Sequence, residues 1–409
     1  MRTLEGSVRA AGARVTAALA ARYRDLDIAE EAFAEACARA AAAWPQIGEP
    51  SDPAAWLYRT ADRAAIDMLR KRKVRSRLAP EPEEIADVDE PCPIPDDRLR
   101  LIFVCCHPAV APDVRAQLTL RLVCGLSTAE IAHAFLLPEP TVAQRLVRAK
   151  RKIAEAGVPF EVPGPAHWPE RMEAVLCTLE IAYSKAHEDA AGAGPHAGYG
   201  PEMIALTELL VDLLPGESEA LAFAALVRFA QARRPARVRP DGAMVPLSEQ
   251  DPALWDRGLI AVGDRLLSRA RQAGQLGPRL LQAELHAAWC ARRSLDEPPP
   301  WPRVLATYDR MLTVRDDPVV RLNRAVALAE VAGPLASLRE VDALSCARLE
   351  GFLPFQAVRA GLLSRLGRVA EARQAYSAAL ALGPGSAERT WLERRRAELD
   401  LTSASSAGT

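Results

Sequence analysis

The segment from Leu126 to Ile153 constrains the fold of this chain most strongly, because it predicts two helices joined by a tight break. Ser127 is a favourable N-cap, and Glu130 three residues later completes a capping box for the first helix. Pro138 ends that helix, because the residue before a proline is driven out of the α region. Pro140 fits the first turn of the second helix, where a missing N–H costs nothing. The segment therefore predicts a helix-turn-helix.

The second helix of this segment has two different faces. Four apolar residues recur at helical spacing and predict a buried stripe: Val142, Leu146, Ala149 and Ile153. The remaining surface is polar and basic, and in a helix-turn-helix such side chains contact base edges and phosphates of the major groove. An amphipathic surface helix with solvated arginines is the alternative. The candidates for duplex recognition are Thr141, Gln144, Arg145, Arg148, Lys150 and Lys152.

A second basic stretch lies in the helix predicted to follow Asp52, which is a suitable N-cap with Pro53 in the first turn. From Arg59 to Arg77 there are eight basic residues and two acidic ones. Bases of a single strand stack on aromatic side chains while cations follow its backbone. The alternative is a core tryptophan and a helix end whose cations oppose the dipole. The candidates for strand binding are Trp56, Arg59, Arg63, Arg70, Lys71 and Arg72.

Two helices are predicted before this stretch, one ending near Tyr23 and one from Asp27 to Trp44, with a turn from Pro45 to Pro50. Acidic residues at the start of the second helix complement its dipole. These acidic residues form either a solvated face or a docking surface for a basic partner. The candidates for docking are Asp27, Glu30, Glu31 and Glu35.

The 409 residues are enough for two or three domains, and the net charge of −1 makes local clusters of charge more informative than the total. Alanine, leucine and arginine are abundant and aromatic residues make up 5%, which predicts an all-α protein. The segment from Glu81 to Asp97 holds eight acids and no base, and it predicts an extended linker. The predicted division is 1–78, linker 79–97, 98–157, linker 158–168, a helical domain 169–399 and a disordered tail 400–409.

No pattern of metal or cofactor binding is found. The eight cysteines lack zinc-site spacing, and the cluster Cys105-Cys106-His107 predicts buried thiols, since adjacent side chains of a helix point apart. The histidines are scattered without a nucleophile at supportive spacing, so we expect no enzyme and no cofactor. Without a signal peptide or membrane span, we expect a cytoplasmic protein.

The C-terminal part predicts one helix after another, with an irregular hairpin or Ω-like piece at 233–251. Around the turn glycine Gly367, five residues match the 34-residue tetratricopeptide (TPR) pattern: Ala360, Ala372, Tyr376, Ala379 and Pro384. A weaker copy spans Asn323 to Leu344. Such repeats form a curved surface for a protein partner or for the chain's own modules, or they serve as a purely structural cap.

At this point two segments resemble a known family. The sequences DIAEEAFAEAC and SDPAAWLYRTADRAAIDMLRKR resemble region 2 of the extracytoplasmic-function (ECF) sigma factors, and LRLVCGLSTAEIAHAFLLPEPTVAQRLVRAKRKI is similar to their region 4. The C-terminal part resembles a subgroup with a TPR-like extension. The resemblance implies that the Asp27–Trp44 helix docks on core RNA polymerase, that the Trp56–Arg72 helix recognises and helps melt the −10 element, and that the helix from Thr141 binds the −35 element.

Three departures from the family pattern stand out: Asp62 where a basic residue is expected, Pro140 where a small residue is more usual, and the stretch Leu179–Gly194. The sequence thus predicts an ECF sigma factor with a TPR-like regulatory domain. A one-component helix-turn-helix regulator with a ligand-binding or partner-binding helical domain is the alternative, although it leaves residues 52–77 unexplained. A TPR scaffold with incidental basic helices is a further rival.

Overall fold

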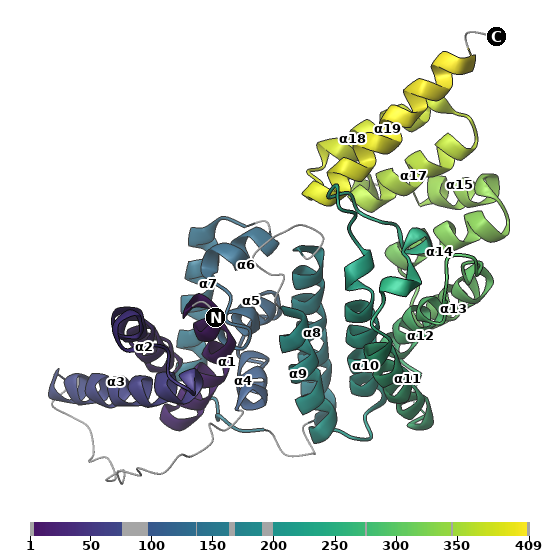
Figure 1. Ribbon diagram of the computed structural model, residues 1–409. Coiled ribbons are helices and arrows are strands. Elements are labelled where there is room, and N and C mark those ends of the chain that lie inside the picture. Colours follow the sequence, from purple (N-terminus) through teal and green to yellow (C-terminus); the bar gives the residue numbers. More distant parts are fainter. Residues whose placement is uncertain are drawn as a thin grey trace. The chain divides into compact units, whose positions relative to one another are not determined.

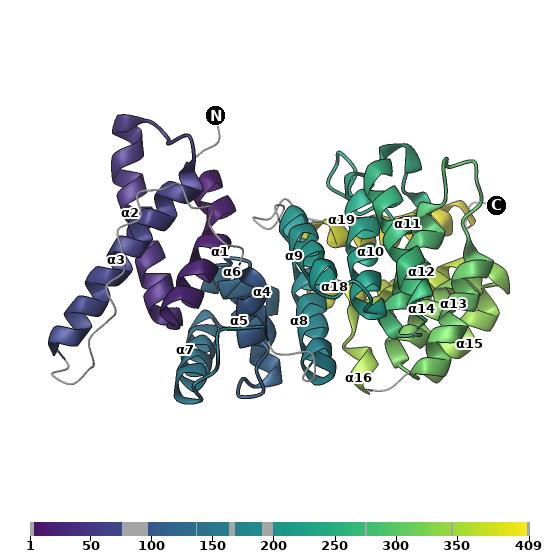
Figure 2. The same ribbon diagram turned by 90° about the horizontal axis from the view of Figure 1, so that it is seen from below.

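A computed structural model describes residues 4–75, 97–135, 137–162, 168–189, 199–274, 276–344 and 347–406. Within these ranges the regular structure is helical, apart from one isolated antiparallel bridge between Val238 and Met244. The predicted all-α class is therefore confirmed. The chain forms two compact units, Met1–Lys185 and Ala186–Thr409, whose helices are labelled in Figures 1 and 2. The predicted acidic linker falls largely outside the described residues.

The first unit begins with three helices that pack on one another, α1 (Leu4–Tyr23), α2 (Leu26–Ile47) and α3 (Pro53–Arg75). Their shared core is rich in alanine, which lets the helix backbones approach closely; Ala32 and Ala36 of α2 and Ala61 of α3 are fully buried. Asp25 caps α2, because its Oδ1 accepts hydrogen bonds from the backbone N–H groups of Asp27 and Ile28 at 2.9 and 3.0 Å.

The end of α2 differs from the prediction of a turn starting at Pro45. The helix continues through Pro45 to Ile47, and Gly48 ends it at φ 82° with its N–H donating to the Trp44 carbonyl. Pro45 donates no backbone hydrogen bond, but buried Trp44 packs edge-to-face on Trp56 with the ring centroids 5.5 Å apart, and this packing holds the last turn. The predicted Asp52 cap of α3 is confirmed, since its Oδ1 accepts the Ala55 N–H at 3.0 Å.

The same unit continues with α4 (Arg98–Cys105), α5 (Pro112–Leu122), α6 (Thr128–Phe135) and α7 (Glu139–Glu155). The capping box is confirmed: the Ser127 N–H donates to Glu130 Oε2 at 2.6 Å, and the Glu130 N–H donates to Ser127 Oγ at 3.2 Å. The predicted stripe of α7 is also confirmed, because its four apolar residues are the buried ones. The helix α8 (Trp168–Asp189) follows, and its Arg171 donates to the Phe103 carbonyl at 2.6 Å.

The second unit is an array of helices, shown from teal to yellow in Figure 1. The helix α10 (Ser218–Ala232) is buried along nearly its whole length against its neighbours. Its Glu219 accepts the backbone N–H groups of Arg279 and Leu280, both at 3.1 Å, and so caps α12 from another helix. The helices around it are α9 (Tyr199–Leu213), α11 (Arg257–Gln272) and α12 (Pro278–Cys290).

The array then continues through α13 (Trp301–Val314), α14 (Pro318–Val331), α15 (Pro334–Ala343), the unpredicted short helix α16 (Ala347–Glu350), α17 (Leu353–Arg365), α18 (Val369–Ala381) and α19 (Ser386–Ser406). Four of the five residues that carry the TPR pattern are buried in a common core: Ala360, Ala372, Tyr376 and Ala379. This burial agrees with the pattern, and the TPR-like assignment remains a prediction. The predicted tail is helical as far as Ser406, because neither proline nor glycine interrupts α19 and buried Leu399 anchors it.

The loop between α10 and α11 was predicted as a hairpin or an Ω-like piece, and its isolated antiparallel bridge between Val238 and Met244 favours the hairpin. This loop is fastened to α19 by a hydrogen bond from the Met244 N–H to the Ala387 carbonyl at 3.1 Å. Two ion pairs add to it, Arg394 with Asp241 at 2.6 Å and Arg395 with Glu249 at 3.2 Å. None of the helices in the described ranges is long and apolar enough to cross a membrane.

Candidate nucleic-acid interface

The polar side of α7 lies opposite its buried stripe. We call this side the recognition face; it comprises Thr141, Gln144, Arg145, Arg148 and Lys152. Gln144, Arg148 and Lys152 are exposed, and the two others are half-buried. Arg145 Nη1 lies 3.6 Å from Asp113 Oδ2, and Arg148 Nε donates to the Gln144 carbonyl at 3.3 Å. These solvent-exposed contacts are weak and exchangeable, so both guanidinium groups can turn to an incoming polyanion.

Lys150 is placed differently from the other predicted recognition residues. Two residues after Arg148 it lies roughly 200° further around the helix, beside the buried stripe. Its side chain is 15% exposed, and its Nζ contacts the carboxylates of Asp27 and Glu30 on α2. The recognition face of the structure therefore does not include Lys150. Counting the basic residues of the helix does not show to which side of it each side chain points.

The basic side of α3 holds most of the other candidates. Arg59, Arg63, Arg70, Lys71 and Arg72 are exposed, whereas Trp56 is half-buried against Trp44. Arg72 Nη1 lies 3.0 Å from Asp25 Oδ2, and Arg70 Nη1 lies 3.9 Å from Asp67 Oδ1. An accessible aromatic ring beside a row of cations is the combination that binds single-stranded nucleic acid in other proteins.

Asp62, the acid that departs from the family pattern, does not face solvent with these cations. Its Oδ1 accepts a 2.6 Å hydrogen bond from the Tyr23 hydroxyl and lies 3.4 Å from Arg22 Nε, and its side chain is 18% exposed. Burial, together with the hydrogen bond to Asp62, raises the pKa of Tyr23 far above its ordinary value. Asp62 therefore serves the contact between α1 and α3.

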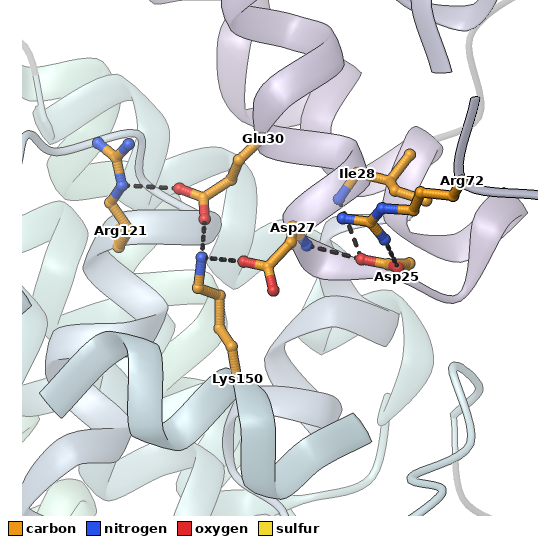
Figure 3. Close-up of polar contacts among 7 residues, drawn as sticks. All are labelled: Asp25, Asp27, Ile28, Glu30, Arg72, Arg121 and Lys150. Atoms are coloured by element: carbon orange, nitrogen blue, oxygen red, sulfur yellow. Dashed lines mark hydrogen bonds and ion pairs between the residues drawn. The ribbon is translucent and has the colours of Figure 1, made fainter. Parts of the chain in front are cut away.

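The acidic side of α2 holds the four predicted docking carboxylates. Asp27 and Glu31 are exposed, and Glu35 pairs with Arg39 at 2.9 Å. Glu30 lies between a cation of α5 and a cation of α7, as Figure 3 shows: its Oε1 accepts from Arg121 Nε and its Oε2 from Lys150 Nζ, both at 2.8 Å. The structure thus brings together residues that the sequence assigns to two separate modules.

Arg121 is a functional candidate that the sequence analysis did not single out. It lies on α5, and besides Glu30 it binds the carbonyl of Leu126, at the entrance to the helix-turn-helix, through Nη1 at 3.0 Å. A lone arginine within the apolar run LTLRLVC was the available signal, because a cation in such a run usually has a partner.

The thiols of Cys105 and Cys106 are buried, as predicted. Burial raises the pKa of Cys106 to about 11, and it raises the pKa of Cys105 well above its ordinary value. Within the described ranges, no three His, Cys, Asp or Glu side chains are grouped so that they could hold a metal ion.

Comparison with protein families gives three matches along the chain. Residues 8–75 match sigma-70 region 2, residues 100–153 match sigma-70 region 4, and residues 171–271 match a family of unknown function, DUF6596. An uncharacterized protein of Rhizobium meliloti (strain 1021) is 38% identical over 393 residues, which cover 94% of this chain and 92% of that protein. No solved structure matches the chain.

Proposed function

The chain belongs to the sigma-70 family, as an ECF-type sigma factor with a C-terminal helical extension, and on this premise we propose that it directs RNA polymerase to promoters with two recognised elements. The observation that carries the proposal is the pairing of two different basic surfaces in one chain, a duplex-type helix in α7 and a strand-type helix in α3. A regulator with a single DNA reader has no use for the second surface.

For the −35 element, we propose that α7 lies in the major groove. Thr141, Gln144 and Arg145 near its start would contact base edges, while Arg148 and Lys152 would contact phosphates. The complete capping box of α6 and the buried stripe of α7 support this proposal, because they hold the recognition face in a fixed orientation.

For the −10 element, we propose that α3 binds the opened strand. Its exposed cations Arg59, Arg63, Arg70 and Lys71 would follow the backbone, and Trp56 would stack on a base. The edge-to-face contact between Trp56 and Trp44 supports the proposal, because it holds the indole in place and lowers the entropy lost on stacking.

For polymerase binding, we propose that the acidic side of α2 docks on a basic surface of the core enzyme through Asp27, Glu30, Glu31 and Glu35. The protein would then act where the polymerase acts, in the cytoplasm. We further propose that the extension acts as a TPR-like regulatory domain whose array of helices binds a protein partner or another part of this chain.

Run-off transcription tests the proposal. The full chain is mixed with core polymerase and a template that carries the promoter of its own operon. A discrete transcript that depends on the chain supports the sigma assignment. A gel shift with duplex DNA alone, without any transcript, would replace it with the one-component regulator.

A further inference from the structure

The second unit contains a cavity of about 470 Å³, lined by the end of α10, by α12 and α13, and by the start of α14. This volume lies in the range of binding sites for small molecules. The lining is mostly apolar. On α12 it comes from Leu281, Leu285 and Trp289, which recur every four residues and therefore lie along one side of the helix. On α13 it includes Tyr308 and Met311.

The apolar wall of the cavity is held in place by its own packing. Four of its residues are buried members of one hydrophobic cluster: Leu281, Leu285, Trp289 and Met311. The ring of Trp289 packs edge-to-face on Trp301, with the ring centroids 4.9 Å apart. A wall fixed in this way needs little rearrangement when a ligand enters, so little binding energy is lost on ordering it.

The lining also carries a buried positive charge. Arg233 follows α10 directly and lines the cavity, although only 7% of this residue is exposed. Its Nη2 donates to Nδ1 of His286 on α12 at 2.7 Å, and its Nε donates to the Phe229 carbonyl at 3.2 Å. A guanidinium group only donates, so His286 accepts through Nδ1 as a neutral imidazole. Neither acceptor carries a negative charge, and these two hydrogen bonds therefore leave the positive charge of Arg233 in the cavity lining.

Other polar groups of the lining add hydrogen-bonding capacity without cancelling this charge. Burial raises the pKa of Tyr308 to about 12, so its phenol stays protonated and can donate. Within the part of the chain that the structure describes, no group hydrogen-bonds the Tyr308 hydroxyl. Asp317 supplies a carboxylate, but its Oδ1 accepts the Val319 N–H at 2.8 Å at the start of α14, and its Oδ2 lies 4.0 Å from Nη2 of Arg315. The charge of Asp317 is therefore balanced locally.

This combination of groups selects the chemical class of the ligand. A cation would be repelled by the guanidinium, and an uncharged apolar molecule would remove water from Arg233 and give it no acceptor in return. An anionic group accepts charge-assisted hydrogen bonds from a guanidinium, while an apolar body covers the leucine and tryptophan side chains of α12.

We propose that this cavity is a binding site for a small organic anion, with its apolar or aromatic body against α12 and α13 and its anionic group on Arg233 and Tyr308. The site belongs to the second unit alone. The extension therefore binds a small molecule whether or not it also binds a protein partner.

Fluorescence titration of the full chain with two probes tests the site. Anilinonaphthalene sulfonate (ANS) carries an anionic sulfonate on an aromatic body, and phenylnaphthylamine has the same body without the charge. We expect ANS to bind at one site with a Kd on the order of 10 μM, as is usual for a ligand of this size. Absence of ANS binding by the native chain would overturn the proposal.

Arg233→Met separates recognition of the charge from recognition of the apolar body. The substitution should weaken ANS binding by roughly tenfold or more, because a charge-assisted hydrogen bond is lost. It should not weaken the binding of phenylnaphthylamine. Arg234→Met is the matched control, since it removes the same charge from the next residue, which does not line the cavity. Equal ANS affinity in Arg233→Met and the native chain contradicts the proposal.

Val319→Trp tests whether the probes occupy this cavity. Val319 lines it and is 41% exposed, so a larger side chain can be accommodated without disturbing the core. The indole should take up part of the cavity and weaken the binding of both probes. Val331→Trp is the matched control on the same helix, because Val331 is 47% exposed and does not line the cavity. If the two variants bind the probes equally well, the probes lie elsewhere and the proposed site is wrong.

Circular dichroism shows whether each variant is folded. If Arg233→Met does not fold, Tyr308→Phe replaces it, because this change removes only a hydroxyl. It should weaken ANS binding by roughly threefold, and unchanged affinity would count against the anion site. These outcomes are independent of the proposed sigma function. A chain that binds ANS as expected but supports no transcription loses only the sigma assignment, and a chain that supports transcription without binding ANS loses only the anion site.

Discussion

The hydroxyl of Tyr23 donates a 2.6 Å hydrogen bond to Oδ1 of Asp62 and so joins α1 to α3 on the inner side of the basic stretch. Arg22 approaches the same oxygen, with Nε at 3.4 Å. An acid within a basic helix is therefore explained by packing, because a hydrogen bond to a charged group at a partly buried site is among the stronger ones.

Asp62→Asn should lower the local stability of the contact between α1 and α3 by about 1–2 kcal/mol, since the charged acceptor is lost. Hydrogen exchange of the α1 and α3 amides measures this loss. Asp67→Asn is the control. Asp67 is exposed on the same helix, and its ion pair with Arg70 is weak because the N–O distance is as long as 3.9 Å. If Asp62 instead weakened DNA binding by repelling phosphates, its replacement would strengthen DNA binding and leave amide protection unchanged.

Ser127→Ala should destabilise the start of α6 by about 1 kcal/mol, because the N-cap hydrogen bond to the Glu130 N–H is lost. The expected signs are faster amide exchange in α6 and lower occupancy of the −35 element. Ser127→Thr keeps the hydroxyl and should restore most of the protection. Equal exchange rates in all three proteins would mean that the capping box has no role in holding the helix.

Arg145→Ala should weaken transcription that depends on the −35 element by about 1–3 kcal/mol if the guanidinium contacts a base. Competition between promoters that differ at one −35 position measures this effect. Arg151→Ala controls for the loss of one charge, since Arg151 pairs with Glu155. An unchanged ranking of promoters with Arg145→Ala would remove this residue from the set that selects sequence.

The raised pKa of Cys106 predicts a loss of stability in alkali. The unfolded thiol ionises near 9.0 and the buried one near 11, so the folded state holds the proton more tightly. Its contribution is fully present below the lower value and is lost as the pH rises through the higher one. We expect a loss of about 1 kcal/mol between pH 8 and pH 10 from this thiol. Urea unfolding followed by circular dichroism should show a smaller pH dependence for Cys106→Ala than for the native chain.

Local features of the fold could be predicted from the sequence because their causes lie within a few residues. The capping box of Ser127 and Glu130 and the buried stripe that begins at Val142 depend on side chains one helical turn apart. The end of α2 was missed, because the buried contact of Trp44 with Trp56 outweighs the local signal of Pro45.

The candidate site was less predictable, because its decisive pairs are distant in sequence. Lys150 and Glu30 are 120 residues apart, and Tyr23 and Asp62 are 39 apart. Local sequence patterns identify these side chains as charged or polar. They do not show which of them form pairs. A helical projection of α7 would have separated Lys150 from Arg148, but only the fold supplies the carboxylates that Lys150 contacts.

The attachment of α19 to the loop between α10 and α11 has a consequence for how this protein can evolve. Helical arrays usually gain and lose repeats easily, because each repeat touches only the next. Here α19 contacts the loop between α10 and α11, where Arg394 meets Asp241 at 2.6 Å. Inserting one helical pair between α12 and α18 would carry Arg394 away from Asp241 and break this contact. An inserted helical pair would therefore cost the attachment of α19 to this loop, whereas surface substitutions elsewhere on the helices leave it in place.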